Sequence, residues 1–286
     1  MANQITSRTY QVHNLDVHVS ERQGKEPAIV LLHGVSMSKQ VWQKQLESEA
    51  LQDHHMISIE LPGHGESGWS GAPADDYTLP GYAHLLTELL PQVIHEPYVI
   101  AGYSMGGNIA VEALPTLRGC IGLMVVNTAI ADGKPADITK AFNQKRAGVL
   151  GTILKEQADD DELRYYARSF FAKKNKEMPN TLATDFKNTD PKARSILAQS
   201  VADGNHEDEL ALLKHAAVPV ALVTGKKDRL GDRDYLKNLD IPKWRGETII
   251  IPRAGHIPQL ENSEDFDATL LAFVEHCQRV SQEQVA

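Results

Sequence analysis

Apolar runs of strand length alternate with longer amphipathic segments along the first half of the chain. Four runs are typical of strands buried on both faces of a parallel sheet, namely residues 28–33, 55–60, 97–101 and 121–126. Three segments between and after them have helical character, namely 38–50, 79–94 and 108–114. Residues 10–19 alternate apolar and polar positions around Asn14, which predicts a hairpin. Strands that alternate with helices predict an α/β fold with a mostly parallel central sheet and helices on both faces.

The alternation of strands and helices stops after Asn127. Residues 130–205 contain no strand-like run, but three stretches look helical, namely 137–150, 160–173 and 191–204. Strand patterns return at 219–224 and 247–251, and a last helix is expected at 265–278. We therefore predict one core domain made of residues 1–129 and 206–286, with a helical insertion over 130–205. The insertion is expected to cap the carboxyl ends of the strands, where open α/β sheets bind ligands, and a dimerisation arm is the alternative.

Composition narrows the choice of partners. The net charge is −9 for 286 residues, and no basic stripe is present to neutralise phosphates, which argues against a nucleic-acid partner. No apolar run approaches the roughly 18 residues of a membrane span, and the first residues lack an apolar signal segment. We therefore expect a cytoplasmic protein without membrane contact. The sequence does not decide the oligomeric state, and a homodimer is one alternative.

A serine between two glycines is the strongest chemical signal. Gly102, Ser104 and Gly106 form a G-x-S-x-G pattern between the apolar run 97–101 and the helical segment 108–114. A serine on a tight strand-to-helix turn is exposed at the top of a parallel sheet, where its hydroxyl can attack a substrate. The pattern alone is weak, because such short matches also arise by chance. The rest of the chain must supply a base, an acid and hydrogen-bond donors.

A base and an acid follow two later strands in the order that this chemistry needs. His256 comes just after the strand pattern 247–251, and Asp228 comes just after 219–224. His256 would take the proton of Ser104, while Asp228 would orient the imidazole and stabilise its charged form. The sequence therefore predicts a catalytic triad of these three residues.

Both later assignments have plainer alternatives. A histidine after a strand is more often structural, and an aspartate there is more often a turn former. Asp232 and Asp234 are rival acids, but they fall at the start of a helix-like segment. The joint order of a serine, an acid and a base, each just past a predicted strand, is what favours catalysis.

The oxyanion that forms during such chemistry needs two N–H donors. We expect one to be the backbone N–H of Met105, at the N-terminus of the following helix, where the helix dipole also favours negative charge. The other is expected to be the N–H of Val35, in the loop after the first buried strand. His33, in the same loop, is expected to form local hydrogen bonds.

Metal and dinucleotide chemistry are not indicated. His13 and His18 are ligand types, but they are five residues apart on a predicted strand and so face opposite sides. Cys120 and Cys277 have no partner at metal-ligand spacing, so free thiols are expected. The glycines around Ser104 do not have the spacing of a dinucleotide-binding loop. We therefore predict no metal and no cofactor.

Five motifs together resemble the α/β-hydrolase superfamily across essentially the whole chain. They lie at residues 32–34, 61–67, 102–107, 223–228 and 254–256. The resemblance implies an α/β-hydrolase fold and agrees with the roles assigned to Ser104, Asp228 and His256. It says little about the substrate, because this fold hosts many chemistries. A serine nucleophile argues against epoxide hydrolase and dehalogenase activity, which use an aspartate there in this superfamily.

Three segments are similar to the metal-independent N-acyl-homoserine lactonases of this superfamily, namely 77–82, 165–169 and 254–258. This resemblance implies that Tyr166, in the insertion, contacts the lactone ring and that Tyr103, before the serine, lines the site. A core position on an amphipathic helix is the alternative for Tyr166. The chain departs from the family pattern at Val35, where an asparagine that bonds the ester is expected.

These observations predict a serine hydrolase of small carboxylic esters or lactones, with an apolar acyl part held under the insertion. An N-acyl-homoserine lactone is one predicted substrate, and a general carboxylesterase or thioesterase is an alternative. A carbon–carbon bond hydrolase would need polar groups under the insertion, such as Arg164 and Arg168. These are more simply explained as a solvated face paired with Asp160 and Asp161. A ligand-sensing protein that keeps the triad without turnover is the non-enzyme alternative.

Overall fold

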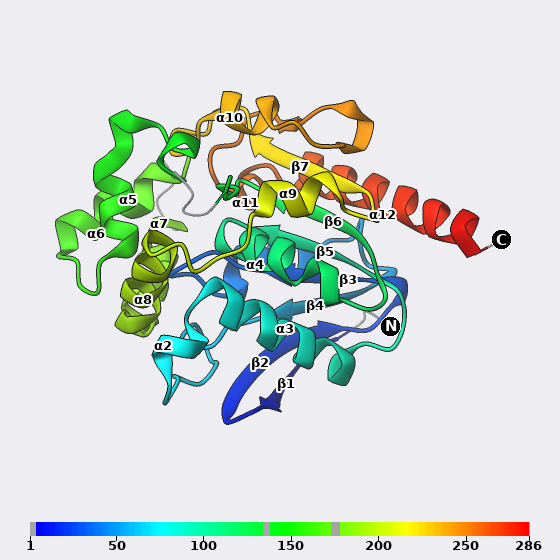
Figure 1. Cartoon of the computed structure of the whole chain (residues 1–286), viewed down its shortest axis with the longest axis horizontal. Coiled ribbons are helices and arrows are strands. Elements are labelled where there is room, and N and C mark those ends of the chain that lie inside the picture. Colours follow the sequence, from blue (N-terminus) through cyan, green and yellow to red (C-terminus); the bar gives the residue numbers. More distant parts are fainter. Residues whose placement is uncertain (1–3, 134–137, 173–177, 286) are drawn as a thin grey trace.

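The computed structural model describes residues 4–133, 138–172 and 178–285. Within them, an eight-stranded sheet in the order β1-β2-β4-β3-β5-β6-β7-β8 forms the centre of the molecule (Figure 1). Its strands are β1 (Ile5–Val12), β2 (Leu15–Arg22), β3 (Lys25–Leu32), β4 (His54–Ile59), β5 (Tyr98–Tyr103), β6 (Cys120–Val126), β7 (Val220–Gly225) and β8 (Ile249–Ile251). The hairpin of β1 and β2 pairs antiparallel with β4, and the pairs from β4 to β8 are parallel. The predicted mostly parallel sheet is confirmed.

Helices cover both faces of this sheet. On one side lie α3 (Leu79–Val93), α4 (Met105–Ala113) and α9 (Glu209–Lys214). On the other lie η1 (Lys39–Trp42), α1 (Gln43–Leu46), α11 (Pro258–Glu261) and α12 (Ser263–Val285). Short elements complete the core, namely α2 (Pro73–Asp76), η2 (Leu114–Thr116), α10 (Arg233–Asn238) and η5 (Trp244–Gly246). Every residue of β5 and β7 is buried, which explains why these strands are continuous apolar runs.

A separate group of helices lies beyond the end of the sheet toward which the arrow of β7 points (Figure 1). It contains α5 (Ala147–Leu154), α6 (Asp160–Ser169), α7 (Met178–Asn188) and α8 (Pro191–Ala202). The sequence did not predict α7, because Pro179 was interpreted as a break. Proline is tolerated in the first turn of a helix, where its missing N–H would have no partner, and Pro179 is the second residue of α7.

The predicted helix over 137–150 is wrong for most of its described part. Two 3₁₀ turns, η3 (Ile138–Ala141) and η4 (Gln144–Arg146), precede α5 there. The reason is a contact distant in sequence: the N–H of Asn143 donates to the carbonyl of Leu230 at 2.8 Å, and Phe142 forms an isolated β-bridge with Gly231. A backbone paired in this way cannot form helical hydrogen bonds, so the regular helix starts only after it.

The predicted helix over 38–50 is too long, because regular structure ends at Leu46. The guanidinium of the buried Arg22, on β2, donates to the carbonyl oxygens of Leu46 and Leu51. A side chain from the sheet thereby satisfies these two carbonyl groups. The chain from 47 to 53 is held by these hydrogen bonds and does not continue the helix. The last helix, by contrast, is longer than predicted and spans Ser263–Val285.

Arg194 holds the separate group of helices together. Its guanidinium is almost fully buried on α8 and donates to the carbonyl oxygens of Lys155 at 2.6 Å, Glu156 at 2.7 Å and Phe186 at 3.0 Å. It also lies over the Phe186 ring, 3.9 Å from the centroid. One side chain thus joins α8 to the end of α7 and to the segment between α5 and α6.

We expect Arg194→Ala to lower the free energy of unfolding by about 2–4 kcal/mol, because three carbonyl groups lose the buried guanidinium that binds them and its packing on Phe186 is lost. Urea unfolding followed by circular dichroism measures this change. The matched control is Arg164→Ala on the exposed face of α6, which should cost less than about 0.5 kcal/mol. Equal and small changes in both variants would contradict the role given to Arg194.

Candidate active site

Ser104 lies on a tight turn between β5 and α4. Its φ is +52°, in the left-handed region that non-glycine residues rarely adopt. The flanking glycines have no room for side chains. A Cβ on Gly102 would lie 2.4 Å from the carbonyl oxygen of Gly106, and a Cβ on Gly106 would lie 2.5 Å from that of Leu32. Backbone strain of this kind clusters at functional sites, and this turn presents the hydroxyl at the carboxyl end of β5.

His256 and Asp228 lie next to each other after β8 and β7. His256 Nδ1 is 2.8 Å from Asp228 Oδ2, and their side chains are only 6% and 1% exposed. The other carboxylate oxygen accepts from the backbone N–H groups of Leu230 at 2.8 Å and Gly231 at 3.1 Å. Because a carboxylate only accepts, Nδ1 carries the proton, and Nε2 remains as an acceptor for a hydroxyl.

The loop that carries His256 is fixed from two sides. The N–H of His256 donates to the carbonyl of Phe170 at 2.7 Å, and Asn127 Nδ2 donates to the carbonyl of His256 at 2.6 Å. The Phe170 ring also meets the imidazole edge-on, with centroids 5.3 Å apart. Phe170 directly follows α6, so the separate helices contact the candidate base.

The rival acid Asp232 is engaged elsewhere. Its Oδ1 accepts from the N–H of Asp234 at 2.9 Å, which caps the start of α10. Within the described residues, Asp228 is the acid that bonds the His256 ring.

Ser104 and His256 meet at the wall of one apolar cavity of about 360 Å³. No hydrogen bond joins their side chains among the described residues, a spacing that is common before a substrate binds. The core contributes Val35, Met105 and Leu230 to the wall, while α5 and α8 contribute the side chains of Leu150, Ile153, Leu197 and Val201. The cavity therefore joins the carboxyl ends of the strands to the separate helices.

Two backbone N–H groups, those of Val35 and Met105, lie in segments next to Ser104. Within the described part of the chain, neither the N–H of Val35 nor that of Met105 has an acceptor, and both residues line the cavity. The loop of Val35 is close to the serine, because a Cβ added to Gly34 would lie 3.1 Å from Ser104 Cβ. Unpaired N–H groups at a helix start and an adjacent loop are suited to bind a developing negative charge.

A buried histidine holds the loop of Val35. His33 Nδ1 donates to the carbonyl of Gly34 at 2.8 Å, while Nε2 accepts from the N–H of Leu61 at 3.0 Å. Burial lowers the pKa of His33, which favours the neutral ring that this donor–acceptor pair requires. The expected local hydrogen bonding of His33 is confirmed, and it connects the loop after β3 to the loop after β4.

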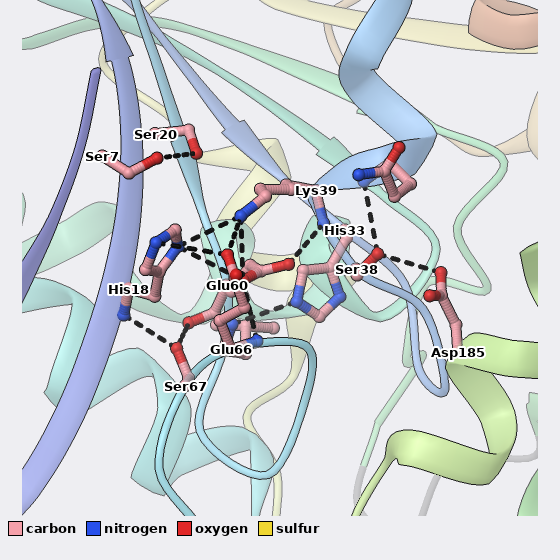
Figure 2. Close-up of polar contacts among 12 residues, drawn as sticks. Ser7, His18, Ser20, His33, Ser38, Lys39, Glu60, Glu66, Ser67 and Asp185 are labelled. Carbon is pink, nitrogen blue, oxygen red and sulfur yellow. Dashed lines mark hydrogen bonds and ion pairs between the residues drawn. The ribbon is translucent and has the colours of Figure 1, made fainter. Parts of the chain in front are cut away.

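A buried carboxylate reinforces the same connection (Figure 2). Glu60 Oε1 accepts from the backbone N–H of Lys39 at 3.2 Å, and Oε2 accepts from that of Glu66 at 2.9 Å. His18 Nδ1 and Lys39 Nζ lie 3.3 Å and 3.6 Å from Oε2. Backbone donors from both loops thus converge on one side chain at the end of β4.

One side-chain bond joins the loop after β3 to α7. Ser38 Oγ donates to Asp185 Oδ2 at 2.9 Å (Figure 2). Burial, with a smaller contribution from the charge of Glu60, raises the pKa of Asp185 to about 6. The separate helices are therefore coupled to the loop that carries the Val35 donor.

Two clusters have the side chains of a metal site, in the described part of the chain. Lys39 Nζ lies among His18, Glu60 and Glu66, so an ammonium group already provides the positive charge in that cluster. The exposed cluster of His13, His84 and Glu88 brings both imidazole Nε2 atoms within 3.4 Å and 3.5 Å of the carboxylate. His13 and His18, considered together in the sequence, belong to different clusters. Neither cluster lines the cavity.

The two tyrosines expected to bind substrate are not part of the cavity wall as described. Tyr103 is fully buried and meets the His256 ring edge-on at 5.7 Å. Tyr166 is fully buried on α6, with its ring against Phe170 at 4.9 Å and Phe186 at 5.5 Å. Neither hydroxyl has a hydrogen-bond partner within the described residues. The structure thus places both rings in a layer behind the cavity.

Two wall residues were missed in the sequence. Asn108 lies in the first turn of α4, which begins directly after Ser104, and a polar residue so close to the candidate nucleophile was a usable signal. Phe170 lies near the end of the predicted helix 160–173, where nothing in the local pattern distinguishes a cavity wall from the core.

Comparison with known proteins identifies the family. The model of the Alpha/beta hydrolase family matches residues 29–269. This chain belongs to the alpha/beta hydrolase family. The fold expected from the motifs is thereby confirmed. None of the described helices combines the length and the apolar character that a membrane crossing requires.

Curated relatives of this hydrolase include two named activities. A pimeloyl-[acyl-carrier protein] methyl ester esterase of Aeromonas salmonicida is 26% identical over 266 residues, covering 89% of this chain and 98% of the relative. An (E)-2-((N-methylformamido)methylene)succinate hydrolase of Acinetobacter baylyi is 33% identical over 121 residues, covering 42% of this chain and 44% of the relative.

Solved structures of the N-acyl homoserine lactonase AidH are similar over nearly the whole chain. The complex with N-butanoyl homoserine has a TM-score of 0.87 and 27% identity, covering 96% of this chain and 97% of that one. A mutant complexed with N-hexanoyl homoserine lactone has the same TM-score of 0.87 and 26% identity, covering 96% and 99%. The resemblance to lactonases of this fold is confirmed. An esterase and a lactonase both act on ester bonds, so an ester-bond hydrolase is the activity class that the comparisons support.

Replacing Asp185 by asparagine should remove a pH-dependent loss of the free energy of unfolding. A carboxyl whose pKa is raised in the folded state contributes its full stability below the unfolded value and loses it as the pH rises through about 6. Asparagine still accepts from Ser38 but does not ionise. We expect the free energy of unfolding of Asp185→Asn, relative to wild type, to rise by about 1–3 kcal/mol between roughly pH 4 and pH 7. Urea titrations at several pH values measure it, and parallel pH curves for the two proteins would contradict it.

Tyr166→Phe separates a packing role from a substrate contact. Because the hydroxyl is buried without a partner in the described residues, we expect KM for an ester substrate to change less than about twofold. The free energy of unfolding should stay equal or rise by about 1 kcal/mol. Initial-rate kinetics and urea unfolding measure both quantities. A tenfold higher KM would instead place the hydroxyl on the substrate.

Proposed function

We propose that this protein hydrolyses the lactone ester bond of an N-acyl homoserine lactone through an acyl-enzyme on Ser104. The arrangement that carries the proposal is the strained turn of Ser104, which places the serine on one apolar cavity with the imidazole of the His256–Asp228 pair. The similarity to AidH structures complexed with N-butanoyl homoserine and N-hexanoyl homoserine lactone supports the choice of substrate.

In the first half of the reaction, Ser104 Oγ attacks the lactone carbonyl carbon, and its proton passes to His256 Nε2. The negative charge that develops on the carbonyl oxygen accepts from the N–H groups of Val35 and Met105. The tetrahedral intermediate then breaks the ring C–O bond, and His256 returns the proton to the departing oxygen. The alcohol remains attached, because the ring opens without fragmenting the molecule.

In the second half, water attacks the acyl-enzyme while His256 takes one of its protons. The bond to Ser104 Oγ breaks, the serine regains its proton, and the ring-opened hydroxy acid leaves. The net change is the addition of one water. Asp228 holds the proton-bearing Nδ1 at 2.8 Å throughout, which keeps Nε2 directed to the serine.

The helical segment 130–205 acts as a cap in this proposal. Its helices α5 and α8 supply apolar side chains to the cavity, which suits an acyl chain. The volume of about 360 Å³ lies near the lower end of the roughly 300–1,000 Å³ that ligand pockets span, which favours a short chain.

An open-chain ester is the second candidate substrate. It is favoured by Val35, whose apolar side chain offers no hydrogen bond to a lactone, and by the relatives named as methyl ester esterases. Carbon–carbon bond hydrolysis has less support. Arg164 pairs with Asp161 on the exposed face of α6, and neither Arg164 nor Arg168 lines the cavity.

We expect Ser104→Ala to lower kcat/KM by about 10³-fold or more, because the nucleophile is lost. Mass spectrometry of N-butanoyl and N-hexanoyl homoserine lactones should show the gain of one water with wild type and no gain above background with the variant. Ser195→Ala, on α8, is the matched control and should retain wild-type turnover.

p-Nitrophenyl butyrate separates the two candidate substrates. Cleavage of this ester without hydrolysis of either lactone would replace the lactonase by an esterase. Turnover by Ser104→Ala at the wild-type rate would contradict the acyl-enzyme itself.

A further inference from the structure

Asn108 is a polar residue in the largely apolar wall of the cavity. It lies on α4, four residues after Ser104, and lines the same cavity. The backbone N–H of Asn108 donates to the carbonyl oxygen of Ser104 at 3.3 Å, so the two residues are joined across the start of the helix. Because both residues line one cavity, a substrate group bound at Asn108 lies near the bond that Ser104 would attack.

The orientation of the Asn108 amide is fixed by its neighbours. Nδ2 lies 2.8 Å from the carbonyl oxygen of Ala129, and a carbonyl oxygen can only accept, so the NH₂ group must be on that side. The same nitrogen lies 2.9 Å and 2.8 Å from the two carboxyl oxygens of Glu209.

Glu209 makes this arrangement rigid. Its side chain is fully buried on α9, and Oε2 accepts from the backbone N–H of Ala131 at 2.7 Å. Burial raises the pKa of Glu209 to about 8. The contact of Nδ2 with Ala129 sets the orientation of the Asn108 amide whichever form Glu209 takes.

The carbonyl oxygen of Asn108 is consequently left for a ligand. Among the described residues, no donor forms a hydrogen bond with Oδ1. This oxygen is also not one of the fully buried side-chain atoms that lack a partner. Asn108 lines the cavity, which is where a ligand would meet this oxygen. A fixed acceptor in an apolar wall favours a ligand with an N–H or O–H group. A ligand without such a group displaces water from the oxygen and forms no hydrogen bond in its place.

We propose that Asn108 Oδ1 accepts a hydrogen bond from the N–H of the substrate's acylamino group, which makes Asn108 a specificity-determining residue for N-acylated esters and lactones. This proposal rests on the proposed function. The lengths involved are short. The nitrogen of an α-acylamino ester is two bonds, about 2.5 Å, from the carbonyl carbon, and an N–H···O bond adds about 2.9 Å. The acceptor therefore has to lie on the same cavity wall as the nucleophile, as Asn108 and Ser104 do.

The test compares substrates that differ in one group. N-hexanoyl homoserine lactone is paired with the analogue in which CH₂ replaces the amide N–H. We expect wild type to favour the amide by about tenfold in kcat/KM, the effect of about one neutral hydrogen bond. In Asn108→Leu the ratio should fall to within about twofold. In Thr139→Val, which removes another polar side chain of the wall, the ratio should stay at the wild-type value.

The ratio within one variant is insensitive to the fraction of folded enzyme, because misfolding lowers both rates equally. Asn108→Leu leaves Glu209 without a side-chain partner, so Asn108→Ser, which admits a water molecule, serves as the second variant if Asn108→Leu does not fold. A wild-type ratio near one, or a ratio unchanged in both Asn108 variants, would overturn the proposal. A fall of the ratio in Thr139→Val to the same extent would also overturn the proposal.

A second pair of substrates separates this proposal from the choice of lactone. It consists of the p-nitrophenyl ester of N-hexanoylglycine and its analogue with CH₂ in place of N–H. If neither lactone is hydrolysed but these esters are, the lactonase proposal fails. The ratio for the two esters then still supports or overturns the role of Asn108.

Discussion

The close approach of α4 to the end of β3 determines where the candidate nucleophile lies. A Cβ on Gly106 would lie 2.5 Å and 2.6 Å from the carbonyl oxygens of Leu32 and His33, so the helix start and the strand end are in backbone contact. This contact brings the loop of Val35 against Ser104. Val35 and Met105, whose N–H groups have no acceptor among the described residues, therefore lie near the serine. The other parts of the site are arranged around this pair of backbones, because neither can move without opening the contact.

The rigidity of the donor loop comes from buried polar groups that satisfy one another. His33 and Glu60 bond backbone groups of the loops after β3 and β4, and the bond from Ser38 to Asp185 adds an attachment to α7 (Figure 2). Donors held in this way need no rearrangement when a negative charge develops, which is the physical basis of electrostatic preorganisation. Through the same hydrogen bonds, the position of the helical segment affects the position of the donor loop.

The sequence was sufficient for features that depend on local pattern. Continuous apolar runs predicted the buried strands, and the order of Ser104, Asp228 and His256 placed three residues at one edge of the sheet, where the structure brings His256 to Asp228 and to the cavity of Ser104. Features set by distant contacts were not predictable. Arg22 binds the carbonyl groups of Leu46 and Leu51, where the predicted helix stops. The backbone near Phe142 pairs with a loop almost ninety residues later. An amphipathic helix likewise does not reveal whether Tyr166 faces a ligand or the core.

The bridge between Phe142 and Gly231 has a mechanical consequence. Phe142 and Leu230 both line the cavity, and the turn from 228 to 231 carries Asp228, whose Oδ1 is held by the N–H groups of that same turn. The surface that would enclose the acyl group in the proposed reaction and the carboxylate that bonds His256 are therefore parts of one backbone unit. A substitution that reshapes this wall is therefore expected to displace the Asp228 carboxylate as well.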